Sequence, residues 1–271
     1  MPAVTPRLPV LPPDSPWSNR IDRALATESP CGVAGYELDR WLSPAEDADR
    51  HREINAWVLG IAGGRARVDH PHLHGGPWLR SVVTGRAGLE LPRVLLGDDL
   101  AIESSRLFVH RPGEPAAVPV HQDVPEHGLL DPRFAVTALY LLAHEGFGQF
   151  ARTAPHTHAD GFLPHEPADT GVFGELPRLD RADGRRWWTA RVPLLPGDVL
   201  CTDLRTLRTF GTDAPWMALV VRWVAPAAVV GRSAGAPPIV RVWGSFVAWD
   251  QAAALARARR RVLGGAAPRP W

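Results

Sequence analysis

The pattern of apolar and polar positions becomes strand-like near residue 80 and stays so to about residue 245. Short apolar or alternating runs follow one another there, each bounded by Gly, Pro or Asp. Such regular punctuation is typical of an antiparallel sandwich or barrel. The runs read LFVHR, AAVPVHQDV, VTALYLLA, WWTARVPLL, GDVLCTD, WMALVVRWVA and IVRVWGSFV. We therefore predict a mainly β domain whose core covers about residues 80–245.

The two ends of the chain depart from this pattern. Residues 1–16 are so rich in Pro that neither a helix nor a sheet ladder is favoured, and we expect an extended arm. Ser43 with Glu46 forms a capping-box pattern before a run with helical signals. The run WDQAAALARARRRVLGG near the C-terminus predicts a second flanking helix. Since neither a repeat nor a linker is evident, residues 17–271 are predicted to form one domain.

Composition narrows the class of protein and partner. The chain has 271 residues, of which 45% are hydrophobic and 22% charged, as in an ordinary globular protein. A formal net charge of +1 gives no reason to expect nucleic acid or a membrane as partner. Cys31 and Cys201 are too few for a disulfide framework, and a signal peptide is not apparent, so we expect a cytoplasmic protein. Every basic residue is Arg, which indicates a GC-rich bacterial genome.

The chemistry suggested by the sequence begins at VHQDV, residues 120–124. His121 and Asp123 are two positions apart in a strand-like run, so both side chains point to the same face. A His and a carboxylate that share a pocket supply two of the three ligands in the two-His-one-carboxylate triad of non-heme iron.

Four segments, in order, resemble the phytanoyl-CoA dioxygenase-like family over roughly residues 90–225. They are LLGDDLAIESSRLFVHRPGEPAAVPVHQD, FAVTALYLLAHEGFGQFARTAPHTH, VPLLPGDVLCTDLRTLRTFG and WMALVVRWVA. The resemblance implies a double-stranded β-helix, also called a jelly roll. In that family the fold holds Fe(II) and 2-oxoglutarate and hydroxylates small molecules.

Two positions depart from the family's pattern. The family's second iron-binding His falls on Arg208, and the last His of the chain is His165, so no shift of alignment restores it. A guanidinium is permanently protonated and has no lone pair for a metal. The family's 2-oxoglutarate-binding Arg falls on Trp216, although a rival alignment keeps Arg222, which shares a strand face with Trp216.

We therefore expect an enzyme that works without oxidation, such as an isomerase, cyclase or lyase, and that takes no cofactor. Arg208 would bind Asp123 through two parallel hydrogen bonds, and His121 would act as general acid or base. Arg208 could also stabilise a developing oxyanion. The substrate would be a hydrophobic small molecule of bacterial secondary metabolism. The candidate substrate-binding residues are Trp216, Arg222 and His158.

Two other functions stay open at this point. The protein could be an Fe(II)- and 2-oxoglutarate-dependent hydroxylase that keeps His121 and Asp123 as ligands, with a substitute among His158, Asp203 and Asp213. It could also be a relative that binds a ligand or a protein without catalysis. The candidate residues have structural interpretations as well. Trp216 could belong to the core, Arg222 to a buried salt bridge and Arg208 to an outward-facing loop.

Overall fold

The structure is a computed structural model, and the placed part of the chain falls into nine segments. They are residues 36–40, 48–74, 86–113, 117–123, 134–145, 150–154, 157–180, 190–229 and 238–244. The predicted arm at residues 1–16, the capping box at Ser43 and Glu46, and the C-terminal helix lie outside these described residues.

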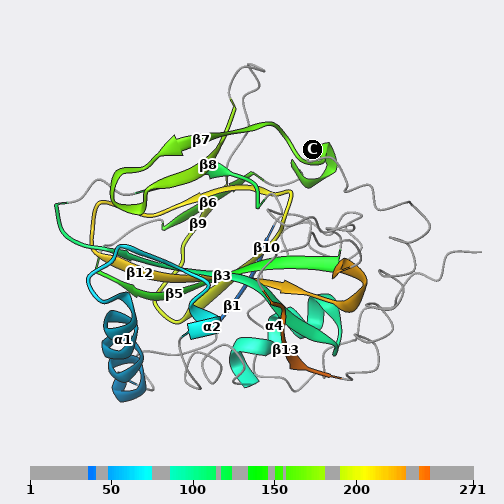
Figure 1. Ribbon diagram of the computed structural model, residues 1–271, viewed down its shortest axis with the longest axis horizontal. Helices are drawn as coiled ribbons and strands as arrows, with labels where there is room; N and C mark the ends of the chain where they lie inside the picture. The colour runs from blue at the N-terminus through cyan, green and yellow to red at the C-terminus, as the bar shows by residue number, and fades with distance from the viewer. Residues whose placement is uncertain are drawn as a thin grey trace, which may run out of the picture.

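Two antiparallel sheets face each other and account for most of the described strands (Figure 1). The larger sheet runs in the order β1 (Tyr36–Arg40), β10 (Asp198–Asp203), β5 (Ala135–His144), β12 (Trp216–Val224), β3 (Leu100–His110) and β13 (Val240–Trp243), with β2 (Arg67–Asp69) also paired to β3. The smaller sheet runs in the order β4 (Val118–His121), β11 (Leu207–Phe210), β6 (Ala151–Ala154) and β9 (Ala190–Val192).

Consecutive strands alternate between the two sheets. The chain passes from β3 to β4, β5 and β6, and later from β9 to β10, β11 and β12, crossing from one sheet to the other at each step. This alternation winds the two sheets into a double-stranded β-helix, so the predicted jelly-roll fold is confirmed.

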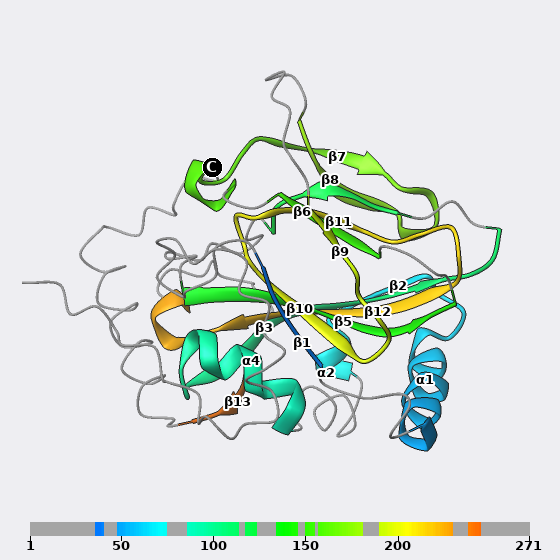
Figure 2. The ribbon, with the colours of Figure 1, turned by 180° about the vertical axis from the view of Figure 1, so that it is seen from behind.

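Three helices cover the outer face of the larger sheet, away from the smaller one (Figures 1 and 2). They are α1 (Ala48–Ala62), α2 (Pro71–His74) and α4 (Arg86–Leu96). Leu107 and Phe108 are neighbours on β3, yet Leu107 packs with α1 and α4 while Phe108 packs between the sheets. The strand period of two therefore supplies apolar residues to both layers.

A hairpin is inserted between β6 and β9 and forms a two-stranded sheet of its own. It consists of β7 (His165–Asp169) and β8 (Glu175–Leu179), joined by the short helix η3 (Gly171–Phe173). Figures 1 and 2 show it beside the smaller sheet, on the side away from the helices. The short helix η2 (Thr157–Asp160) precedes the hairpin, and η5 (Pro226–Val229) follows β12.

The helices in the described part of the chain are all too short or too polar to span a membrane.

Candidate functional site

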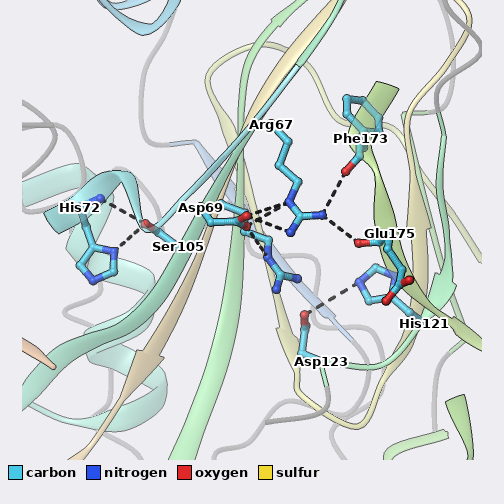
Figure 3. A network of polar contacts seen from close by, with 9 residues as sticks. Arg67, Asp69, His72, Ser105, His121, Asp123, Phe173 and Glu175 are labelled. Carbon is cyan, nitrogen blue, oxygen red and sulfur yellow. Dashed lines mark hydrogen bonds and ion pairs between the residues drawn. The ribbon is translucent and has the colours of Figure 1, made fainter. Parts of the chain in front are cut away.

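His121 and Asp123 lie together at the end of β4, on the inner side of the barrel. The Nε2 atom of His121 is 3.9 Å from the Oδ1 atom of Asp123 (Figure 3). Alternation along the strand explains their shared side, because Gln122 between them points the other way. His121 is 6% exposed and Gln122 is fully buried, whereas the side chain of Asp123 is 12% exposed, so the triplet lies at the edge of the interior.

Arg208 reaches the same place from the neighbouring strand. Its Cα is the register partner of His121 on the β4–β11 ladder, and its side chain is only 2% exposed. The NH2 atom lies 2.5 Å from Oδ2 of Asp123, and NH1 donates a hydrogen bond of 2.5 Å to Oγ1 of Thr202. Contact with Asp123 therefore joins one nitrogen to one oxygen, instead of the two parallel hydrogen bonds expected from the sequence.

The pair of Asp123 and Arg208 remains charged although it is buried. Burial by itself opposes ionisation of Asp123, but Arg208, His121 and Arg222 together hold the pKa of its carboxyl below the usual range. Burial also lowers the pKa of Arg208, and the attraction of Asp123 opposes that change. The Nε and NH2 atoms of Arg208 and Oδ2 of Asp123 have no aligned hydrogen bond. Since NH2 and Oδ2 contact each other, Nε of Arg208 is the donor that neither the hydrogen bonds nor the ion pair use.

His121 is neutral at pH 7. Burial lowers its pKa to about 4, and Arg208 acts in the same direction, although Asp123 favours the charged ring. Its Nδ1 atom is 2.7 Å from the carbonyl oxygen of Pro119, so the neutral ring carries its proton there and donates it to that carbonyl. Nε2 is then left with a lone pair that can accept a proton.

Two small cavities meet at Asp123. The first has a volume of about 30 Å³ and is lined in part by Glu103 and Arg222. The second has a volume of about 20 Å³ and is lined in part by His121 and Arg208. Each is large enough for about one or two water molecules.

The three candidate substrate-binding residues lie in different parts of the structure. Arg222 lies near Asp123, with NH1 3.1 Å from Oε2 of Glu103 and NH2 3.5 Å from the backbone oxygen of Asp123. Trp216 is 1% exposed within a cluster of aromatic rings between the sheets, and its Nε1 donates to the backbone oxygen of Thr212. His158 lies on η2 and is not among the described residues that line the two cavities.

Gln122 is the site residue that the sequence reasoning missed. Its Nε2 donates to the backbone oxygens of Gly161 and Arg205, and its Oε1 accepts from the backbone N–H of Leu163. The backbone N–H of Gln122 also donates to Nε2 of His165. The only signal for this role in the sequence is a large amide between two interior-facing residues, on the opposite face of the strand.

We expect Gln122→Leu to lower the free energy of unfolding by about 2–3 kcal/mol, because it leaves three partly buried backbone groups without their partners. Urea denaturation measures the change. Arg152→Leu on the exposed side of β6 is the matched control and should shift the free energy by less than about 0.5 kcal/mol. Equal effects of the two substitutions would contradict the role given to Gln122.

Comparisons with known proteins give likeness of structure alone. No family model matches the sequence, and no curated protein is similar to it. The non-heme monooxygenase ThoJ in its apo form superposes with a TM-score of 0.57 at 21% identity, over 82% of this chain and 91% of that one. The non-heme alpha ketoglutarate dependent carbocyclase SnoK from nogalamycin biosynthesis gives a TM-score of 0.57 at 21% identity, over 78% and 92%. The epimerase SnoN in complex with Fe3+, alpha ketoglutarate and nogalamycin RO gives 0.56 at 18% identity, over 79% and 92%.

These structures correct the expectation that no cofactor is bound. ThoJ has been solved as a Ni complex and SnoN with Fe3+ and alpha ketoglutarate, so the fold suggests iron and 2-oxoglutarate. The described side chains around His121 and Asp123 do not fit such a metal. Within the described residues, no three His, Cys, Asp or Glu side chains gather as a metal site, and the NH2 of Arg208 lies 2.5 Å from a carboxylate oxygen of Asp123. The chain therefore has the fold of these non-heme enzymes.

Proposed function

We propose that this protein is a phytanoyl-CoA dioxygenase-like enzyme that moves a proton on a hydrophobic small molecule, as an isomerase, cyclase or lyase does. His121 acts as the base, Arg208 stabilises the anion that forms, and Asp123 positions Arg208. In this proposal Arg208 has taken the place of the family's second iron-binding His.

One observation carries the proposal. A neutral His121 is held by Pro119 so that its Nε2 lone pair faces a buried pair of Asp123 and Arg208. A base requires a free lone pair, and a carbanion next to a carbonyl requires a fixed positive charge near its oxygen. The site brings these two requirements together in a space that excludes bulk water.

The proposed step is a proton transfer at a carbon next to a carbonyl. The C–H bond breaks, the proton passes to Nε2 of His121, and the electron pair moves onto the carbonyl oxygen. The charge of Arg208 and its Nε–H, which makes no hydrogen bond, stabilise that enolate oxygen. The proton then returns to the other face of the carbon or to another atom. Alternatively, the enolate carbon attacks a second carbonyl of the substrate and closes a ring, and Nε2 of His121 gives its proton to the alkoxide oxygen that forms.

The walls of the site favour an apolar substrate. The cavity that contains His121 and Arg208 is also lined by Phe108, Phe210 and Val118. SnoN, an epimerase, and SnoK, a carbocyclase, both come from nogalamycin biosynthesis, so the same fold serves isomerisation and ring closure in a biosynthetic pathway. This precedent supports a role for the protein in bacterial secondary metabolism.

The second candidate is an Fe(II)- and 2-oxoglutarate-dependent oxygenase with a substitute ligand. It is favoured by the alpha ketoglutarate dependence that is stated for SnoN and SnoK. His121 and Asp123 would supply two ligands, and the third would come from His158, Asp203 or Asp213. Asp203 already binds Arg205 through both carboxylate oxygens, at 2.9 and 2.7 Å, so its use would require that ion pair to open.

Turnover in D₂O distinguishes the two candidates. The protein, reconstituted anaerobically with Fe(II) and then supplied with 2-oxoglutarate and air, is incubated with aromatic polyketides, and the products are examined by mass spectrometry. Our proposal predicts a product with no added oxygen and no succinate formed, which carries one deuterium from the solvent on carbon where the proton returns to carbon. His121→Ala should reduce its rate by about 10²–10⁴-fold.

The opposite result is equally specific. A product heavier by one oxygen atom, formed together with one succinate per turnover, would support the oxygenase and contradict our proposal. Incorporation of deuterium at an unchanged rate in both His121→Ala and Arg208→Met would show that other residues move the proton.

A further inference from the structure

The cavities that lead to His121 and Arg208 are too small for an organic substrate. Their volumes are about 30 and 20 Å³, whereas sites for small organic ligands occupy about 300–1,000 Å³. Some wall of the site must therefore move before a substrate reaches Nε2 of His121.

The β7–β8 hairpin forms the wall that can move most easily. Leu176 and Pro177 of β8 line the same cavity as His121 and Arg208. The hairpin pairs only within its own two-stranded sheet, so its displacement breaks no hydrogen bonds of the two barrel sheets. A barrel strand could not move in this way, because each is paired to a neighbour along its length.

The base of the hairpin is fixed to the site. The backbone N–H of Leu163 donates to Gln122, and Nε2 of His165 accepts from the backbone N–H of Gln122. The N–H of Asp180 donates to the carbonyl of Pro164 and closes the base of the two strands. Movement is thus favoured at the far end of the hairpin, around η3.

That far end is held by Arg67 of β2 (Figure 3). The NH1 atom of Arg67 donates to the backbone oxygens of Phe173, at 3.0 Å, and Glu175, at 2.8 Å. Its Nε and NH2 atoms bind Asp69 at 2.8 to 3.1 Å. Asp69 also accepts from Nε of Arg106, which lines both cavities. Arg67 therefore connects the hairpin to the wall of the site through a single carboxylate.

Phe173 fills an apolar space beneath this end of the hairpin. Its ring centroid is 5.2 Å from that of Phe108 and 5.4 Å from that of Trp216, and the side chain is 2% exposed. Phe108 also lines the cavity that contains His121. If the end of the hairpin lifts, Phe173 leaves an aromatic pocket that is continuous with the site.

We propose that the β7–β8 hairpin is the cover of the site, that Arg67 is the positioning residue that holds it closed, and that the space beneath Phe173 receives the apolar ring of the substrate. This inference deepens the proposed function, since it names the part of the substrate that the pocket selects. The motion of the cover itself is tested without any substrate.

Hydrogen exchange and chemical labelling of His121 test the cover together. Exchange is followed by mass spectrometry in peptides spanning residues 165–179 and in peptides of the larger sheet, and His121 is labelled with diethyl pyrocarbonate. Arg67→Met should accelerate both exchange in the hairpin and labelling of His121 by about tenfold, because hydrogen bonds from a charged donor are lost. Exchange in residues 216–224 should not change.

Arg178→Met is the matched control, because Arg178 belongs to the same hairpin but pairs with Glu166 on its exposed surface. It should leave labelling of His121 at the wild-type rate. Arg67→Lys, which keeps the charge but loses the planar fork, should fall between Arg67→Met and wild type. Labelling of His121 at the wild-type rate in Arg67→Met would overturn the cover, and so would equal acceleration across the whole chain. Both readouts stand apart from the turnover experiment, so failure of one proposal is distinguishable from failure of the other.

Discussion

Arg208→Met is expected to lower the free energy of unfolding by about 3–5 kcal/mol at pH 7. The substitution keeps most of the side-chain volume but removes the charge that faces Asp123, 2.5 Å away. Asp123 would then remain ionised and buried, with Arg222 in contact only with its backbone oxygen. A buried charge without its partner costs several kcal/mol, far more than the net value of the pair itself. Urea denaturation at pH 7 measures the loss.

Two further variants identify the cause of that loss. Asp123→Leu combined with Arg208→Met removes both charges and should recover most of the free energy, because an apolar pair can replace a buried ion pair. Arg178→Met breaks an exposed pair with Glu166 and should cost less than about 1 kcal/mol. An effect of Arg208→Met no larger than that of Arg178→Met would mean that Arg208 faces solvent in solution.

The layer structure of the barrel could be predicted from the sequence because it depends on local patterns. Short apolar runs separated by turn residues predict the strands of a sandwich or barrel. The jelly roll itself is implied by the resemblance to the phytanoyl-CoA dioxygenase-like family. The period of two is sufficient to bring His121 and Asp123 to one side of β4. Arg208 joins them because the β4–β11 ladder places it opposite His121, a relation that the resemblance to the phytanoyl-CoA dioxygenase-like family implies.

Other contacts of the site depend on register, which the sequence does not specify. A shift in the β12–β3 register between Arg222 and Trp223 accompanies the pairing of Arg222 with Glu103 across the ladder. Trp216 and Arg222 belong to one strand, yet one ring is enclosed by other aromatic side chains and the other side chain reaches the site. The pattern of the strand alone cannot distinguish these positions, because both are buried.

The expectation that no cofactor is bound depends on one residue. Arg208 stands where the resemblance places an iron-binding His, and its guanidinium cannot bind a metal. The solved structures of the fold contain Ni, Fe3+ and alpha ketoglutarate, which a single substitution in the sequence could not reveal. The side chains of the site are those of this chain, whereas the cofactors are those of the solved structures with the same fold. The turnover experiment tests whether this chain uses such a cofactor.

The stability of the protein is expected to fall by about 3 kcal/mol between pH 7 and pH 4 through His121 alone. Its pKa is lowered from 6.5 to about 4 in the folded state. Between these two values the unfolded chain binds a proton that the folded chain does not, so the free energy of unfolding increases with pH across this window. Below about pH 4 both states carry the proton, and this contribution no longer changes.

His121→Gln isolates that contribution, because the amide has a similar size and no proton to gain. The wild type and His121→Gln are compared by urea denaturation at several pH values, since His144 and His165 also have lowered pKa values and contribute in the same direction. The free energy of unfolding of the wild type, minus that of His121→Gln, should fall by about 3 kcal/mol from pH 7 to pH 4. The lowered pKa of Asp123 acts in a separate window below pH 3.8, where its protonation removes stability as pH falls. Parallel curves for the two proteins would mean that the ring of His121 reaches water and is not held neutral beside Arg208.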